Sequence, residues 1–214
     1  MVKIGHLVPV TVVKALPNYE SYLTLIAGTE LLALLPKKYA NRNFRIGDAT
    51  LAAIFQMEGN RITLSQKSPQ YIRKLMELIL APLLREGKVQ VKRAAMVSKC
   101  KFAKVAIESL NDTDPVKQCL PYLKAAEQYT DDTITLVRYS GDIKEYIVNA
   151  LSPAPPEMVR KVIHFKSSRE ADVYVDPAYV GLFLGKGGAN VASAAKLTGV
   201  AINIKCSILD SVNY

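Results

Sequence analysis

The segment Gly181-Leu-Phe-Leu-Gly-Lys-Gly-Gly-Ala-Asn190 places a glycine-rich loop between two stretches of helical character. Within it, Gly185-Lys-Gly-Gly188 fits the pattern GXXG, and the small residues of 189–197 predict a helix that starts directly after the loop. Glycines let a sugar-phosphate chain approach the backbone without meeting a Cβ atom, the start of the helix directs free N–H groups at an anion, and Lys186 adds positive charge. The segment therefore predicts a nucleic-acid clamp, although a plain turn between two helices would need glycine too.

The expected clamp includes the apolar flank of the loop. Four nucleotides would run past the glycines, with their bases over a groove supplied by apolar side chains. The residues predicted to bind RNA are Leu184, Gly185, Lys186, Gly187, Gly188, Asn190, Val191 and Ile204. Other phosphate loops fit less well, because Gly187 follows Lys186 where a P-loop needs Ser or Thr, and the glycine spacing is wrong for a dinucleotide fingerprint.

Outward from the loop, the chain reads as two αβ units of one architecture. In the second, alternating residues predict strands over 159–165 and 171–175, a helix–turn–helix over 177–198 and a last strand after Gly199. The first begins at Ser68-Pro69, a good helix start, and continues with strands over 88–97 and 101–108, a helix from Asp114-Pro115, a strand over 133–139 and a helix over 142–151. Pro82 is expected to interrupt the first helix, and Ser152-Pro-Ala-Pro-Pro156 is expected to be a linker. We place the two domains at 67–153 and 154–214.

The first 66 residues follow a different pattern of short apolar runs separated by turn residues. The runs are Leu7–Val13, Tyr22–Ile26, Leu31–Leu35, Ala49–Phe55 and Arg61–Leu64. Such a series predicts a small closed β-barrel of the OB type, over residues 1–66. Tyr19, Tyr22 and Phe44 are candidate base-stacking residues of this barrel, although single aromatic residues are as often packing residues. The whole chain is thus expected to be an α+β multidomain protein.

The amino-acid composition and the net charge exclude some classes of function. Half of the 214 residues are hydrophobic and the net charge is +9, so the chain can bury a core and favours a polyanionic partner. It contains no run of eighteen apolar residues and does not start like a secretory signal, so no membrane association is expected. Three dispersed cysteines suit a reducing cytoplasm and argue against a disulfide framework, and two histidines leave little for a metal site. No cofactor and no catalytic centre are expected.

Several strings together resemble the NusA family of bacterial transcription elongation and termination factors, over nearly the whole chain. Asn43–Asp48, Ile62–Ser65 and Ser68–Glu77 resemble the late strands of its S1 barrel and the helix that follows. Lys104–Ile107, Asp114–Val116 with Cys119, and Asn149–Pro153 resemble its first KH domain and the junction after it. Leu184–Val191, Ala195–Gly199 and Ile202–Lys205 resemble its second KH domain.

The resemblance implies an S1 barrel followed by two prokaryotic-type (type II) KH domains that bind one single-stranded RNA, without catalysis. It further implies action in the cytoplasm on RNA polymerase in pausing, termination and antitermination, with other antitermination factors as possible partners, and we expect a monomer. Weaker RNA contacts of the first KH domain are expected from Lys99, Lys101, Lys104 and Lys124.

Three departures from the family pattern modify this expectation. The chain starts at the barrel, where the family normally begins with a polymerase-docking domain, so we expect either a cut chain or a protein without that anchor. The first KH loop is Pro121-Tyr-Leu-Lys124 instead of GXXG, followed by a helix that is expected to be short, and Lys99-Cys-Lys-Phe102 replaces the usual Pro-Gly-Ser-Arg turn. We therefore expect RNA binding to be concentrated in the second KH domain.

Three alternatives to a transcription factor remain at this point. The chain could be an RNA-binding module of ribosome maturation or translation. It could also be the RNA-binding part of a ribonuclease or polynucleotide phosphorylase, although those enzymes generally carry one KH domain before the barrel. In the third alternative the role is structural and the GXXG loop is idle.

Overall fold

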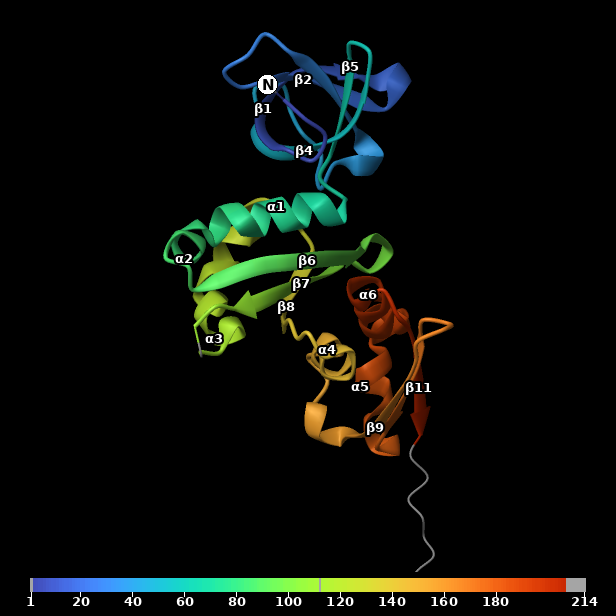
Figure 1. The fold of residues 1–214 in the computed structure, drawn as a ribbon. Helices are drawn as coiled ribbons and strands as arrows, with labels where there is room; N and C mark the ends of the chain where they lie inside the picture. Colours follow the sequence, from blue (N-terminus) through green and yellow to red (C-terminus); the bar gives the residue numbers. More distant parts are fainter. Residues whose placement is uncertain (1, 112, 207–214) are drawn as a thin grey trace, which may run out of the picture. The chain divides into compact units, whose positions relative to one another are not determined.

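The computed structural model describes residues 2–111 and 113–206, which form two compact units. One unit contains residues 2–82 together with 121–132, and the other contains residues 83–120 together with 133–206. Figure 1 labels their elements, and each unit is described by itself. Short 3₁₀ turns join many of the elements, namely η1 (Pro17–Tyr19), η2 (Lys37–Tyr39), η3 (Ser98–Cys100), η5 (Pro156–Met158), η6 (Pro177–Tyr179) and η7 (Lys186–Gly188).

The first unit is built around a closed five-stranded barrel. Its strands are β1 (Leu7–Leu16), β2 (Ser21–Ile26), β3 (Leu32–Pro36), β4 (Ala49–Glu58) and β5 (Arg61–Ser65), in the order β1-β2-β3-β5-β4 with β1 closing on β4. Only the β3–β5 pair is parallel among the described pairs of this barrel. Closure removes the exposed strand edges. The predicted OB-type (S1) barrel is confirmed.

Tyr22 and Phe44 lie in the core of the barrel. Their rings meet edge to face at 5.7 Å, and only 3% and 7% of their surfaces are exposed. The Tyr22 hydroxyl accepts a hydrogen bond from the Phe44 backbone N–H at 3.2 Å, which gives the buried phenol a partner. The prediction that these two rings stack on bases is therefore wrong, because neither face is open to a nucleotide. Tyr19 is 77% exposed and stays a candidate.

A helix and a 3₁₀ segment complete the first unit. Helix α1 (Pro69–Ile79) is capped by Ser68, whose hydroxyl accepts from the Tyr71 N–H at 3.1 Å, as its sequence predicts. A break at Leu80 separates α1 from the short α2 (Ala81–Arg85), close to the interruption expected at Pro82. The buried Tyr71 hydroxyl donates to the Tyr129 carbonyl at 2.7 Å, which attaches the end of η4 (Leu120–Gln128) to α1.

The second unit contains two three-stranded sheets. The first has the order β6 (Val89–Val97), β7 (Phe102–Ser109), β8 (Thr133–Arg138), and the second has the order β11 (Ala201–Cys206), β10 (Glu170–Val175), β9 (Val159–Phe165). In each, one pair is antiparallel and one is parallel. The helices of this unit are α3 (Pro115–Cys119), α4 (Ile143–Ala150), α5 (Val180–Leu184) and α6 (Ala189–Thr198). In the second sheet with α4, α5 and α6, the order helix, two strands, two helices, strand is that of the type II KH fold. The predicted α+β fold class of a barrel followed by KH domains is confirmed. None of the helices within the described residues is long and apolar enough to cross a membrane.

The two sheets of this unit share one hydrophobic core, here called the shared core. Helix α6 packs on β6 and β7 as well as on β11 of its own sheet (Figure 1). Ala106 and Val137 from the first sheet belong to the same buried cluster as Val173 and Phe183 from the second KH fold. Ala154, in the segment expected to be a linker, is also buried in this cluster. That segment is therefore packed into the protein rather than solvated.

Candidate nucleic-acid interface

The GXXG loop lies between α5 and α6 and needs glycine for its backbone. Gly185, Gly187 and Gly188 have φ of 71°, 58° and 73°, in the region that side-chain-bearing residues rarely adopt. At Gly185 there is a second reason, because a Cβ atom there would lie 2.7 Å from Asn190 Cβ and 2.9 Å from Asn190 N. At Gly187 and Gly188 nothing lies within 4 Å of such an atom, so the space over these two residues is open.

The loop also leaves the start of α6 without a side-chain cap. Gly188 is the N-cap residue, and no side chain accepts a hydrogen bond from the first turn. The Gly188 N–H donates to the Gly185 carbonyl at 3.0 Å and the Ala189 N–H donates to the Lys186 carbonyl, so these two donors are used within the loop. The other N–H groups at a helix start attract anions, and the neighbouring Lys186 is exposed. The loop can therefore offer backbone donors and one positive charge to a phosphate.

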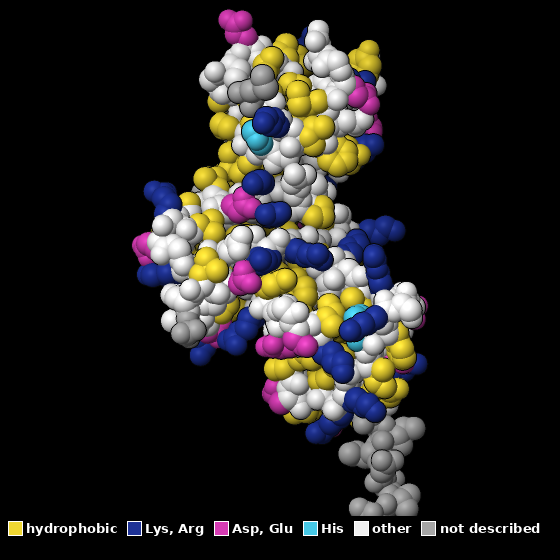
Figure 2. Space-filling model, in the orientation of Figure 1, with side chains coloured by type: hydrophobic (Ala, Val, Ile, Leu, Met, Phe, Trp, Pro, Cys, Tyr) yellow, Lys and Arg dark blue, Asp and Glu magenta, His cyan; other side chains and the backbone are white. Residues whose placement is uncertain are grey.

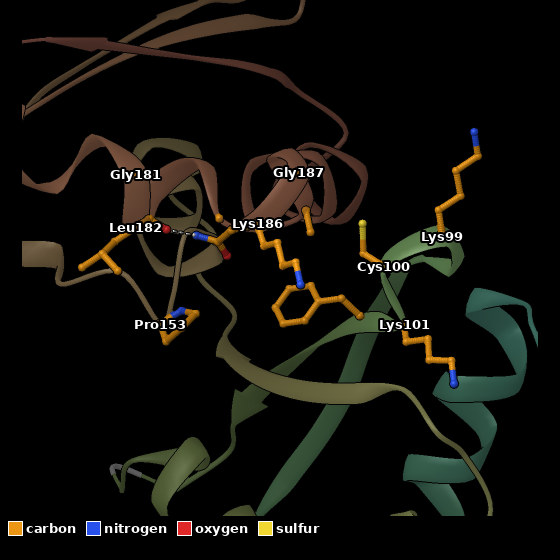
Figure 3. Close-up of a pocket in the computed structure, with 12 residues that line it drawn as sticks. Lys99, Cys100, Lys101, Pro153, Gly181, Leu182, Lys186 and Gly187 are labelled. Carbon is orange, nitrogen blue, oxygen red and sulfur yellow. Dashed lines mark hydrogen bonds between the residues drawn. The ribbon is translucent and has the colours of Figure 1, made fainter.

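A cavity of about 770 Å³ opens beside the loop and extends to the turn between β6 and β7. Its lining residues are Lys99, Cys100, Lys101, Phe102, Pro153, Gly181, Leu182, Gly185, Lys186, Gly187, Ala189 and Asn190. Figure 3 shows the Lys186 side chain extending from the loop towards the turn, while the side chains of Lys99 and Lys101 diverge from it. Two regions predicted separately to bind RNA thus meet at one cavity within one compact unit.

Positive charge near the cavity comes from few residues, because most basic side chains of the β6–β7 region are engaged elsewhere. Lys92 pairs with Glu108 at 3.1 Å, and Arg93 donates to the Leu197 carbonyl at 3.5 Å. Figure 2 likewise shows Lys and Arg mixed with Asp and Glu over the visible face. Lys99, Lys101 and Lys186 are the lysines that line the cavity, and all three side chains are exposed.

Lys104 is buried inside the protein. It was expected to bind phosphate from the first KH domain, but its side chain is completely buried and Nζ donates to Ser152 O and Asn190 Oδ1, each at 2.6 Å, and to Ala150 O. Burial lowers the pKa of this amine to about 7. The prediction of a direct phosphate contact is therefore wrong.

Asn190 has a different role from the one expected. Only 4% of it is exposed, and its Nδ2 donates to the carbonyls of Leu151, Leu182 and Phe183 at 2.7, 3.2 and 3.1 Å. Its amide is fully used inside the protein, so it shapes the cavity wall and has no free donor for RNA.

The apolar flank predicted for the bases lies near the loop but outside the cavity. Leu184 is 39% exposed, and Val191 and Ile204 are partly buried against the shared core. Neither they nor Gly188 line the cavity. That these side chains carry bases stays a prediction.

The first KH loop has a conformation of its own. Pro121–Lys124 lies in η4, a 3₁₀ segment, where the second KH fold has its GXXG loop and α6. Lys124 is exposed and belongs to the compact unit that contains the barrel. The helix after Pro121–Lys124 was expected to be short, and in the structure a 3₁₀ segment that ends at Gln128 takes its place.

Sequence reasoning missed the apolar members of the cavity wall. Leu182 is 57% exposed and points away from the core that its neighbour Phe183 fills. Phe102 ends the turn after Lys101, and Pro153 comes from the segment expected to be a linker. The sequence held no clear signal for Leu182, because adjacent helical residues lie only about 100° apart and any side chain of α5 could be the buried one.

Comparison with known proteins gives matches along most of the chain. Residues 143–210 match the family model of the NusA-like second KH domain. The chain is 31% identical over 186 residues to the transcription termination/antitermination protein NusA of Halalkalibacterium halodurans, covering 82% of this chain and 47% of that protein. It is 32% identical over 156 residues to that of Rickettsia prowazekii (70% and 30% covered) and 29% identical over 206 residues to that of Bacillus subtilis (91% and 53%). The chain thus spans about half the length, or less, of these relatives.

Proposed function

We propose that this chain, which resembles NusA transcription termination/antitermination proteins through an S1-type barrel and two KH folds, binds single-stranded RNA. The observation that carries the proposal is the cavity at which the GXXG loop, Lys186 and the lysines of the β6–β7 turn meet. KH folds clamp the backbone of about four nucleotides at such a loop, with the bases turned to an apolar flank.

Each part of the cavity has a role in this proposal. The backbone N–H group of Gly187 binds one phosphate, because no Cβ atom at Gly187 or Gly188 obstructs its approach, while the Gly188 N–H donates to the Gly185 carbonyl at 3.0 Å. Lys186 supplies charge at the same phosphate, while Lys99 and Lys101 attract the next stretch of the strand. Leu184, Val191 and Ile204 are proposed to face the bases.

The cellular role follows from the relatives and is likewise a proposal. The relatives are named for transcription termination and antitermination, so we propose that this chain works in the cytoplasm as a non-catalytic part of that system, with RNA polymerase and other antitermination factors as partners. Modulation of pausing belongs to the same proposal.

The test is a fluorescence-anisotropy titration of a single-stranded RNA library, with single-stranded DNA as the control, at about 50 mM and about 200 mM salt. Saturable binding that weakens with salt is expected. Removal of one phosphate-binding lysine, Lys186→Gln, should weaken binding to all sequences alike and lower the salt slope by about 1.

Lys166 in the turn between β9 and β10 provides the matched control, because it is exposed and lies outside the cavity. Lys166→Gln removes the same charge from the protein and should leave the slope nearly unchanged. Equal slopes for the two variants, or no binding at low salt, would refute the RNA site.

A further inference from the structure

Lys104 occupies a place where a charged side chain is costly. It lies on the central strand β7, is 0% exposed and forms no ion pair with any described residue. A buried ammonium group is tolerated only where each of its N–H donors has an acceptor. A protein with an apolar residue of similar size at such a position is usually as stable or more stable. A reason other than stability is therefore needed for a lysine at this position.

The three acceptors of Lys104 come from three different segments. Ala150 is the last residue of α4, Ser152 lies in the packed segment after it, and Asn190 is in the first turn of α6. An ammonium group carries three N–H donors, so the charged form matches the three oxygens one to one. One side chain of the first KH sheet thus fixes the start of the second KH fold and the helix behind the GXXG loop.

Asn190 connects Lys104 to the GXXG loop. Its Oδ1 accepts from Lys104, and its Nδ2 donates to the carbonyls of Leu182 and Phe183 in α5. Gly185 packs so closely on Asn190 that a Cβ atom would not fit between them. Both ends of the GXXG loop are therefore held by one amide whose orientation Lys104 sets.

We propose that Lys104 is a positioning residue that orients Asn190, and through it the GXXG loop, relative to the β6–β7 turn, so that the loop and turn lysines bind one RNA strand together. This inference rests on the proposed RNA binding, but the placement of the loop can be tested without RNA. Lys104 Nζ lies 5.7 Å from the centroid of the Phe102 ring and donates to three oxygens, and none of these groups titrates.

The main test compares Lys104→Met with Lys92→Met in two assays. Lys92 lies on the neighbouring strand β6 and pairs with Glu108, so its replacement removes the same charge from the same sheet without touching Asn190. In the first assay, ¹⁵N-glycine labelling gives one amide signal per glycine. Lys104→Met should shift the signals of Gly185, Gly187 and Gly188 and leave the barrel glycines in place, whereas Lys92→Met should shift none of the loop signals.

The second assay is RNA affinity measured on folded protein. Lys104→Met should weaken binding about 10-fold, in the range of coupling between sites, and Lys92→Met less than about 3-fold. Unchanged loop signals in folded Lys104→Met would overturn the inference. If Lys104→Met shifts the loop signals but the unsubstituted protein binds no RNA, the positioning role stands and the proposed function is refuted.

A measurement on the native chain covers the case in which Lys104→Met does not fold. Raising the pH from 6 to 9 removes the third proton of Lys104, so the loop glycine signals should move with the same midpoint as the Lys104 side-chain signal. Loop signals that stay constant while Lys104 titrates would also overturn the inference.

Discussion

Gly187 gives the sharpest test of the phosphate clamp, because Asp and Asn substituted there impose similar backbone strain and differ mainly in charge. Its φ of 58° and ψ of 26° lie in the left-handed region that Asn and Asp tolerate best among side-chain-bearing residues, and nothing lies within 4 Å of a Cβ atom built there. Gly187→Asp and Gly187→Asn should therefore both fold, with similar melting temperatures.

The two variants differ by one negative charge at the place where a phosphate is expected. A carboxylate about 5 Å from a phosphate charge costs about 1 kcal/mol in water-like surroundings and about 3 kcal/mol at the lower effective dielectric of a protein surface. The aspartate variant should thus bind RNA about 5- to 150-fold more weakly than the asparagine variant.

Anisotropy titrations of both variants with one RNA, at low and high salt, measure this ratio directly. The ratio should shrink as salt rises, because an exposed charge is screened. Two folded variants with equal affinity at low salt would show that no phosphate lies near Gly187, and the clamp would have to be abandoned.

Three further predictions concern buried groups. Phe44→Ala should destabilise the barrel by about 3–5 kcal/mol in thermal unfolding, with RNA affinity of the folded protein unchanged; a large loss of affinity would return Phe44 to the candidate RNA contacts. Because burial lowers the pKa of Lys104 to about 7 while the unfolded chain keeps about 10.5, the unfolded chain binds more protons and the free energy of unfolding should rise from pH 7 to 9 by up to about 1.4 kcal/mol per pH unit. Above pH 9 the Cys119 thiol, whose pKa burial raises to about 11, should offset the rise, so that the free energy of unfolding levels off. A flat profile from pH 7 to 9 in denaturant titrations would contradict this account of Lys104. In thiol titration at pH 8, the exposed Cys100 and Cys206 should react at once and Cys119 only after denaturation, so three fast thiols would show that Cys119 is accessible.

The sequence predicted those features that depend on local chemistry. The glycines of Gly185–Gly188 indicated a backbone that only they adopt easily, and Ser68 indicated the start of α1 through its capping hydroxyl. Short apolar runs with turn residues between them indicated the barrel. Each of these signals is contained within a few consecutive residues, so no knowledge of distant contacts was required.

The features that were missed depend on contacts between distant segments. Charge alone suggested that Lys104 faced solvent, although residues 103–107 form an unbroken buried run, which is typical of a central strand covered on both faces. Tyr22 and Phe44 could not be assigned to core or surface, because an aromatic ring suits both. Three prolines suggested a linker, but Ala154 among them is held in the shared core.

The shared core has a consequence for how the second KH fold can be used. Cutting the chain after β8 would expose the apolar faces of α6 and of the β6–β7 strands to water at once, and surfaces of that kind promote aggregation. The GXXG segment therefore cannot be transferred alone to another protein with its RNA affinity intact. Deletion mapping that stops between the two sheets would report misfolding as loss of RNA binding, and any engineered exchange has to transfer both sheets together.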